Sequence, residues 1–214
     1  MSDLNYKFGG REMFWCTPIY YFDLKNSEQI NNKLKKLIFD WKREDKGIVR
    51  SNSFGWHSPA DMELKEEFKF FVDELDTMKN KIFSTEEYKS GTELFFEGMW
   101  ANVSQKYAYN LYHKHPGHLW SGVYYVQSPP NCGNIVFKVL EFLNWTPSYE
   151  KKSGDRQSHQ WDTVNYDPIE GRAIFFPSWV GHEVEQNLTN VEGDDGNRIS
   201  ISFNINQRKG KVDV

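Results

Sequence analysis

The segment Glu170-Gly-Arg-Ala-Ile-Phe-Phe-Pro-Ser-Trp-Val-Gly-His182 combines a tight turn, a short apolar run, a proline and a histidine. The run between the glycine and the proline has the length and composition of a buried β-strand. Proline ends such a strand, and the histidine then lies just beyond it. A single histidine after a strand is most often a surface loop residue. The end of a buried strand is nevertheless a suitable place for a metal ligand, and such a ligand needs partners elsewhere in the chain.

His113 and His115 are the best candidates for these partners. If the backbone is extended there, side chains two residues apart lie on the same face, roughly 7 Å apart along the strand. Imidazole is a good ligand for iron, zinc, copper and nickel. We therefore expect one mononuclear metal site formed by His113, His115 and His182. The alternative for the pair is an exposed strand end without a metal.

Downstream of His182, the strand that begins at Arg198 has one polar face, formed by Arg198, Ser200 and Ser202. An arginine on an inner strand is costly to bury unless it meets water or an anion, and its guanidinium can bind a carboxylate through two hydrogen bonds. The alternative is a solvated outer face.

The second half of the chain has the pattern of an all-β region. Its β-rich runs are separated by Gly, Pro and Asn. They are Glu93–Phe96, Met99–Val103, Ser121–Val126, Asn134–Val139, Arg172–Phe176 and Ile199–Ile205. An earlier run, Met13–Phe22, contains Pro18 and is expected to be an edge strand. The polar stretch Thr146–Asp167 is the best candidate for a long loop.

Two amphipathic helices precede this region. The first is expected to begin with Ser27 as its N-cap and to end near Lys46, and the second to begin at Ser58-Pro59 and run through Leu64 to Ile82. We expect a single domain over residues 1–214, mainly β with flanking helices. Residues 1–91 would supply helical and edge-strand support, and residues 92–207 a β-sandwich or jelly-roll core.

Composition excludes several classes of partner. The chain has 26 basic and 30 acidic residues and a net charge of -4, so neither nucleic acid nor an acidic membrane is expected to bind. The two cysteines, Cys16 and Cys132, favour a reducing compartment over a disulfide framework. Neither a signal peptide nor a membrane span is recognisable, which favours a cytoplasmic protein. The sequence does not indicate an oligomeric state.

The order of motifs resembles the 2-oxoglutarate and Fe(II)-dependent oxygenases, in particular a branch known from bacteria and marine phages. The resemblance spans roughly residues 100–203. It rests on five motifs, namely His113-Lys-His115-Pro-Gly117, Ser121-Gly-Val-Tyr-Tyr125, Glu170-Gly with Phe176-Pro-Ser-Trp179, His182-Glu-Val184 and Arg198-Ile-Ser200.

This resemblance implies a double-stranded β-helix that binds Fe(II), 2-oxoglutarate as cosubstrate and O2. It assigns His113 and His182 as iron ligands, Arg198 with Ser200 as the binding site for the far carboxylate of oxoglutarate, and Tyr125 as a further hydrogen-bond donor to it. The implied activity is a dioxygenase, and specifically a hydroxylase, that releases succinate and CO2.

His115 departs from the family pattern, since the wider superfamily has Asp or Glu at this position. Three arrangements are open: His115 is a third imidazole ligand, His115 lies outside the ligand set while water fills the position, or His118 approaches instead. We favour the first. A second departure follows Phe137, where Lys138-Val-Leu-Glu-Phe replaces an Asp-Pro-Arg-like turn.

The substrate is expected to be a small molecule or a peptide, with a prolyl or other amino-acid residue as one candidate. Trp120, Trp179 and Trp161 could face it, although core packing is the commoner role of such residues. His57 and His159 have no assigned role. Two other functions fit the histidines: a cupin-type three-histidine metalloenzyme that does not use oxoglutarate, and a non-catalytic β-sandwich binding module.

Overall fold

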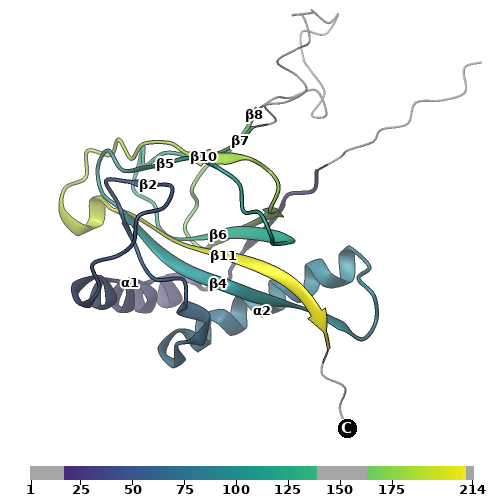
Figure 1. The fold of residues 1–214 in the computed structure, drawn as a ribbon. Helices are drawn as coiled ribbons and strands as arrows, with labels where there is room; N and C mark the ends of the chain where they lie inside the picture. The colour runs from purple at the N-terminus through teal and green to yellow at the C-terminus, as the bar shows by residue number, and fades with distance from the viewer. Residues whose placement is uncertain (1–16, 139–162, 211–214) are drawn as a thin grey trace, which may run out of the picture.

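The computed structural model describes residues 17–138 and 163–210. Two antiparallel sheets face each other, and helices α1 (Ser27–Glu44) and α2 (Lys69–Thr85) cover the outer face of the larger sheet (Figure 1). The larger sheet has the strand order β1 (Tyr20–Asp23), β9 (Arg172–Pro177), β6 (Trp120–Gln127), β11 (Arg198–Lys209), β4 (Thr92–Ser104) and β3 (Trp56–His57). The smaller sheet has the order β2 (Asn52–Ser53), β5 (Tyr109–His113), β10 (His182–Val184), β7 (Ile135–Lys138) and β8 (Thr163–Tyr166). The expected mainly β architecture with flanking helices is confirmed.

Strand β11 shows how the larger sheet separates the core from the cavity. Its residues Ile199, Ile201 and Phe203 are fully buried and belong to the core cluster between this sheet and the two helices. The alternate residues, beginning with Arg198 and Ser200, lie on the opposite face, toward the smaller sheet, because side chains alternate along a strand. The polar face predicted for this strand is therefore an inner face and not a solvated outer one.

A second apolar cluster lies between the two sheets. It is formed by residues of β6, β7 and β9 together with the turn before β10, namely Val123, Tyr125, Ile135, Phe137, Ile174, Phe176 and Val180. Four of its members, Val123, Tyr125, Ile135 and Phe176, line the same cavity as the polar residues of β11, β4 and β5.

The predicted start of the second helix is wrong. Ser58 does not cap a helix: its hydroxyl accepts a hydrogen bond from the backbone N–H of Ala101 in β4 (3.0 Å). The chain then forms two short 3₁₀ helices, η1 (Met62–Leu64) and η2 (Glu66–Phe68), before α2 begins at Lys69. Leu64, expected on the buried face, is 81% exposed. The first helix does begin at Ser27, but its N-cap is Asn26.

The strands predicted from apolar runs are present in the structure, whereas two short polar strands were not predicted. Two predicted strands form one continuous strand, β4, which passes through Gly98 at φ 100°. β1 is an edge strand as predicted and begins two residues after Pro18. β5 and β10 were not predicted, and β8 occupies the end of the expected loop Thr146–Asp167. The remainder of that loop lies outside the described residues.

The segment Ile48–His57, which we call the strap, joins the two sheets at one side. β2 of the strap pairs with β5 in the smaller sheet, and β3 pairs with β4 in the larger one. Its base is closed by the hydrogen bond from the N–H of Ile48 to the carbonyl of His57 (2.8 Å). Within the described residues, no helix is both long and apolar enough to cross a membrane.

Candidate metal centre

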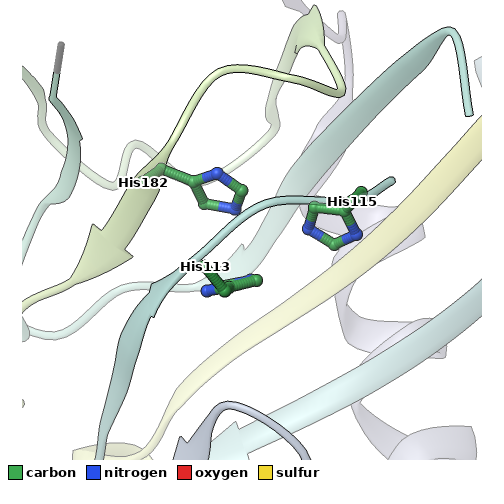
Figure 2. A group of neighbouring side chains, drawn as sticks. All are labelled: His113, His115 and His182. Carbon is green, nitrogen blue, oxygen red and sulfur yellow. The ribbon is translucent and has the colours of Figure 1, made fainter. Parts of the chain in front are cut away.

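His113 and His182 come from two neighbouring strands and face each other. His113 is the last residue of β5 and His182 the first of β10, and they are direct partners in the antiparallel ladder. Their ring centroids are 4.3 Å apart. Figure 2 shows both rings directed into the same space between the sheets. A non-local strand pairing thus places two histidines that are far apart in the sequence in one site.

Each of these two rings is held by a backbone carbonyl. His113 Nδ1 lies 2.6 Å from the carbonyl oxygen of Leu111, and His182 Nδ1 lies 3.0 Å from that of Val180. A carbonyl oxygen can only accept, so Nδ1 carries the hydrogen in both rings. Nε2 is then unprotonated and presents its lone pair, which is the form of imidazole that binds a metal.

His115 is placed by a different set of contacts. Its backbone N–H donates to the carbonyl of Ser178 (3.0 Å), which fixes the turn after β5 next to the turn before β10. Its ring stacks on His182 at 5.2 Å and 4° on one side. On another side it stacks on Trp100 at 5.9 Å and 24°. Trp100 in turn stacks on His57 at 5.3 Å and 10°.

The three histidines fit a metal ion. One ring nitrogen from each residue lies within 4.8 Å of those of the others. An ion about 2 Å from each nitrogen requires the nitrogens to lie within about 4 Å of one another, so small ring rotations suffice to bind it. The strand pairing and the carbonyl bonds supply most of this arrangement before a metal enters.

Burial keeps the three imidazoles uncharged. It lowers the pKa of His182 to about 3 and that of His115 to about 4, and in both cases the neighbouring His113 contributes to the shift. The pKa of His113 is also lowered, mainly by burial. Metal binding requires deprotonated imidazole, so all three residues are ready to bind a cation at neutral pH.

The other groups considered as ligands are occupied elsewhere. His118 lies against Glu97, with Nδ1 3.3 Å from the carboxylate. Glu183 forms an ion pair with Lys138 at 2.5 Å, so the lysine at the unexpected position after Phe137 faces this acid. Asp162 lies outside the described residues. Within residues 17–138 and 163–210, no carboxylate joins the three-histidine cluster.

A cavity of about 450 Å³ opens beside the histidines. It is lined by all three of them and by Arg198, Ser200 and Tyr125. The six residues predicted from the sequence therefore border one space. Its apolar wall, which includes Val123, Ile135 and Phe176, belongs to the cluster between the sheets.

Arg198 is 2% exposed and is anchored at one end of its guanidinium only. Nη1 donates to the carbonyls of Cys132, Gly133 (3.2 Å) and Glu185 (3.0 Å). Nη2 is buried and has no hydrogen-bond partner among the described residues. Burial lowers the pKa of Arg198 from its ordinary value, and Tyr125 opposes this shift. A buried donor without a partner costs free energy, so this nitrogen indicates a ligand that is an acceptor.

Tyr125 and Ser200 lie on neighbouring strands and are direct partners in the β6 and β11 ladder. Tyr125 is 2% exposed, and burial raises the pKa of its hydroxyl above the ordinary value. It therefore remains a protonated hydrogen-bond donor. Ser200 adds a second hydroxyl on the same inner face.

Neither of the two described tryptophans that were candidates to face the substrate, Trp120 and Trp179, lines the cavity. Trp120 belongs to the core on the helix side of the larger sheet, where Nε1 donates to the hydroxyl of Tyr88 (2.7 Å). Trp179 is 59% exposed and does not line the cavity. Trp161 lies outside the described residues. Trp100 was not predicted from the sequence, and His57 had no assigned role. Both line the cavity, but the sequence does not show which side chains of β4 and β3 point to the inner face.

A family model described as "Putative 2OG-Fe(II) oxygenase" matches residues 98–204, which is half of the chain and includes all three histidines and Arg198. The chain belongs to this family. The oxygenase therefore uses Fe(II), 2-oxoglutarate and O2, as the sequence resemblance implied. No protein of curated function matches it significantly in sequence.

Solved structures show the fold of the oxygenase. A prolyl-4-hydroxylase from Pseudomonas putida is 13% identical, with a TM-score of 0.59 over 88% of this chain and 92% of that one. HygX from Streptomyces hygroscopicus, with nickel and 2-oxoglutarate bound, is 11% identical, with a TM-score of 0.56 over 89% and 83%. A Trichoplax adhaerens prolyl hydroxylase, in complex with a hypoxia inducible factor peptide, is 12% identical, with a TM-score of 0.58 over 87% and 82%. The predicted double-stranded β-helix is confirmed.

Proposed function

We propose that this oxygenase is a hydroxylase that acts on an aliphatic C–H bond and uses a three-histidine iron site. Its iron ligands would be His113, His115 and His182, and its oxoglutarate-binding residues Arg198, Ser200 and Tyr125. Bound iron and oxoglutarate would supply the oxidising chemistry: with O2, oxoglutarate is decarboxylated to succinate and CO2, and one oxygen atom enters the substrate C–H bond as hydroxyl. The protein supplies binding, orientation and exclusion of water.

The observation that carries this proposal is the unpaired Nη2 of Arg198, buried in the same cavity as the histidines. Oxoglutarate has a carboxylate at each end. A guanidinium that lines the cavity and has an unpaired nitrogen can bind one carboxylate, while the other end of oxoglutarate is left to the histidine cluster. A metal site that did not use oxoglutarate would not need a buried cation on this strand.

The hydroxyls of Tyr125 and Ser200 would complete the binding of that carboxylate. Both are on the inner face, and the raised pKa of Tyr125 keeps its proton available for donation. The apolar wall beside them, including Val123 and Phe176, excludes water from this end of the cavity. In a dry site, charge-assisted hydrogen bonds are stronger than in water.

An amino-acid residue, such as a prolyl residue, is a substrate consistent with this site, as is a free small molecule. The prolyl hydroxylases of P. putida and T. adhaerens share the fold, and the second was solved with a peptide. We also propose that the chain is one domain, since residues of α1 and α2 form a shared core with β4, β6 and β11.

An anaerobic titration tests the cofactor assignment. Addition of Fe(II) and oxoglutarate to the metal-free protein is expected to produce the visible absorption of the chelate, and addition of O2 to release succinate. His182→Ala is expected to give neither. A wild-type protein that shows no such absorption, and retains no more iron than His182→Ala, would contradict the proposal.

A further inference from the structure

The strap contributes polar side chains to the cavity that neither iron nor oxoglutarate uses. Arg50, Ser51 and His57 line the cavity from this segment. They belong to the side of the cavity formed by β3, β4 and β5, whereas Tyr125 and the apolar wall belong to β6, β7 and β9. A substrate that reaches the metal alongside oxoglutarate therefore meets the strap.

His57 is the buried member of this group, with 5% of its surface exposed. Its Nδ1 lies 2.6 Å from the carbonyl oxygen of Ser58, so this nitrogen carries the hydrogen. Nε2 is left as an acceptor at the border of the cavity. Burial, and to a smaller extent the charge of Arg50, lowers the pKa of His57 and keeps the ring neutral. A neutral acceptor at this position requires a donor on the ligand.

The charges around the cavity favour an acidic ligand. The described residues that line it include Arg50, Lys114 and Arg198 and no Asp or Glu. Arg198 is engaged by the proposed oxoglutarate carboxylate. No ion pair among the described residues involves Arg50, whose Nη1 donates to the carbonyl of its neighbour Val49 (3.2 Å). The three-imidazole site also lacks the negative charge of the usual carboxylate ligand.

Hydrogen bonds to β5 hold the strap in place beside the cavity. The carbonyl of Ser51 accepts a hydrogen bond from the N–H of Leu111 (2.9 Å), and its hydroxyl lies 3.2 Å from Asn110 Nδ2. At its base, Gly47 has φ 76°, and a Cβ there would lie 2.6 Å from the ring of Trp56. A preorganised wall binds a ligand without the entropy cost of ordering a loop.

We propose that the strap is the substrate-recognition wall: Arg50 binds a carboxylate of the substrate, and His57 Nε2 accepts a hydrogen bond from an amino or hydroxyl group near it. The substrate class is thus an acid with an adjacent donor, as in an α-amino acid. The carboxylate comes either from a free acid or from the C-terminus or an acidic side chain of a peptide. This inference rests on the proposed function of the same site.

Matched pairs of compounds test the carboxylate requirement. The probes are the free L-amino acids and their primary amides, and capped tripeptides with a C-terminal acid or amide or with Asp or Asn in the centre. The readout is succinate release above the rate without substrate. We expect at least one acid to stimulate release and its neutral partner to do so at least about tenfold less, as expected for loss of a charged hydrogen bond. The free and peptide arms identify the source of the carboxylate.

Two variants test the residues. Arg50→Gln is expected to raise the KM for the active acid at least about tenfold and to remove the preference for the acid over its amide. Arg50→Lys is expected to retain most of that preference. His57→Phe keeps a ring against Trp100 but lacks the acceptor, so we expect a raised KM for the acid. In all three variants the absorption of the anaerobic Fe(II) and oxoglutarate chelate should match that of the wild type, which separates the strap from the metal site.

The outcomes distinguish the two proposals. Loss of the chelate absorption in the wild type overturns the proposed function. An intact absorption, together with a panel in which no acid exceeds its amide or an Arg50→Gln variant with an unchanged KM for the acid, overturns the role of the strap alone. Because Arg50 is exposed at the mouth of the cavity, the KM for the acid should also rise with ionic strength in the wild type and not in Arg50→Gln.

Discussion

His182 lies directly opposite His113 across the β10 and β5 pair, and the two rings are 4.3 Å apart. Side chains of paired residues point to the same face of a sheet, so this register is what allows both rings to reach one ion. A slip of one residue would turn one histidine to the outside. The metal site therefore depends on the pairing of two short strands.

Removal of either of the two paired histidines, which we propose as ligands, should strongly weaken iron binding. We expect His182→Ala and His113→Ala to lower the affinity for Fe(II) by more than about 100-fold, since loss of a partner outside the ligand shell already costs about 10- to 100-fold. Anaerobic equilibrium dialysis measures this affinity. His118→Ala is the matched control, because His118 faces Glu97 and lies outside the cluster. An equal loss in the control would contradict the assignment.

Substitutions of His115 test whether it is a ligand. His115→Asp introduces the usual carboxylate, and we expect its affinity for Fe(II) to be within about tenfold of the wild-type value. His115→Ala should bind Fe(II) more weakly than both the wild type and His115→Asp. The Asp variant also lowers the charge of the site by one unit, so the reduction potential of bound iron should fall. Potentiometry on the loaded proteins measures the second effect. Full iron affinity in His115→Ala would place this residue outside the ligand set.

Arg198 should control the affinity for oxoglutarate and not for iron. In Arg198→Met the unpaired N–H donor is lost, and we expect the KM for oxoglutarate to rise about 100-fold, in line with loss of a charged hydrogen bond. Iron retention should be unchanged. Ser202→Ala, on the same face of β11, is the control and should leave the KM for oxoglutarate near the wild-type value. An unaltered KM in Arg198→Met would favour a metalloenzyme that does not use oxoglutarate.

Trp100 should act as a positioning residue for His115 through ring stacking. We expect Trp100→Leu to weaken metal binding about tenfold and Trp100→Phe to weaken it less, because phenylalanine keeps an aromatic face. The visible spectrum of the Co(II)-loaded protein reports the coordination geometry. It should change in the Leu variant and remain close to wild type in the Phe variant. Identical spectra and affinities in all three proteins would show that the stack has no such role.

The metal-free protein should lose stability as the pH falls below about 6.5. Burial holds the pKa of His182 at about 3, against 6.5 when exposed. Between these values the unfolded chain binds a proton that the folded chain does not, so the free energy of unfolding decreases with decreasing pH, by up to about 1.4 kcal/mol per unit for this group. Urea unfolding at several pH values, with EDTA present, measures the slope. His182→Gln should show a shallower slope between pH 6.5 and 4, and an equal slope would contradict this origin.

The sequence was sufficient for the parts of the fold that are built from apolar runs. β6 and β9 are apolar and buried on both faces, and polar and apolar residues alternate at the start of β11. Each of these patterns predicts a strand from local sequence alone. β5 and β10 carry His113 and His182 but are short and polar, and they are strands because they pair with each other. Their extended structure is a consequence of tertiary pairing, which local composition does not record.

The same difference applies to the site. The histidines and Arg198 could be proposed from residue type and motif order, since their chemistry is unusual for a strand end. Trp100 and His57 are ordinary core and loop residues by composition. Their stack becomes visible only when β3 is placed beside β4, with His57 opposite Asn102. The false helix start at Ser58 has a related cause, because a serine followed by proline satisfies the local rule for a cap while its hydroxyl is engaged by a distant strand.

The carbonyl bonds to His113 and His182 have a consequence for how this protein can change over evolutionary time. Their acceptors are the main-chain oxygens of Leu111 and Val180, two residues before each ligand, and every amino acid carries such an oxygen. Side-chain replacements at these two positions leave the acceptors in place. Substitutions in the surrounding sequence can therefore reshape the cavity for a new substrate while the orientation of the two rings is retained.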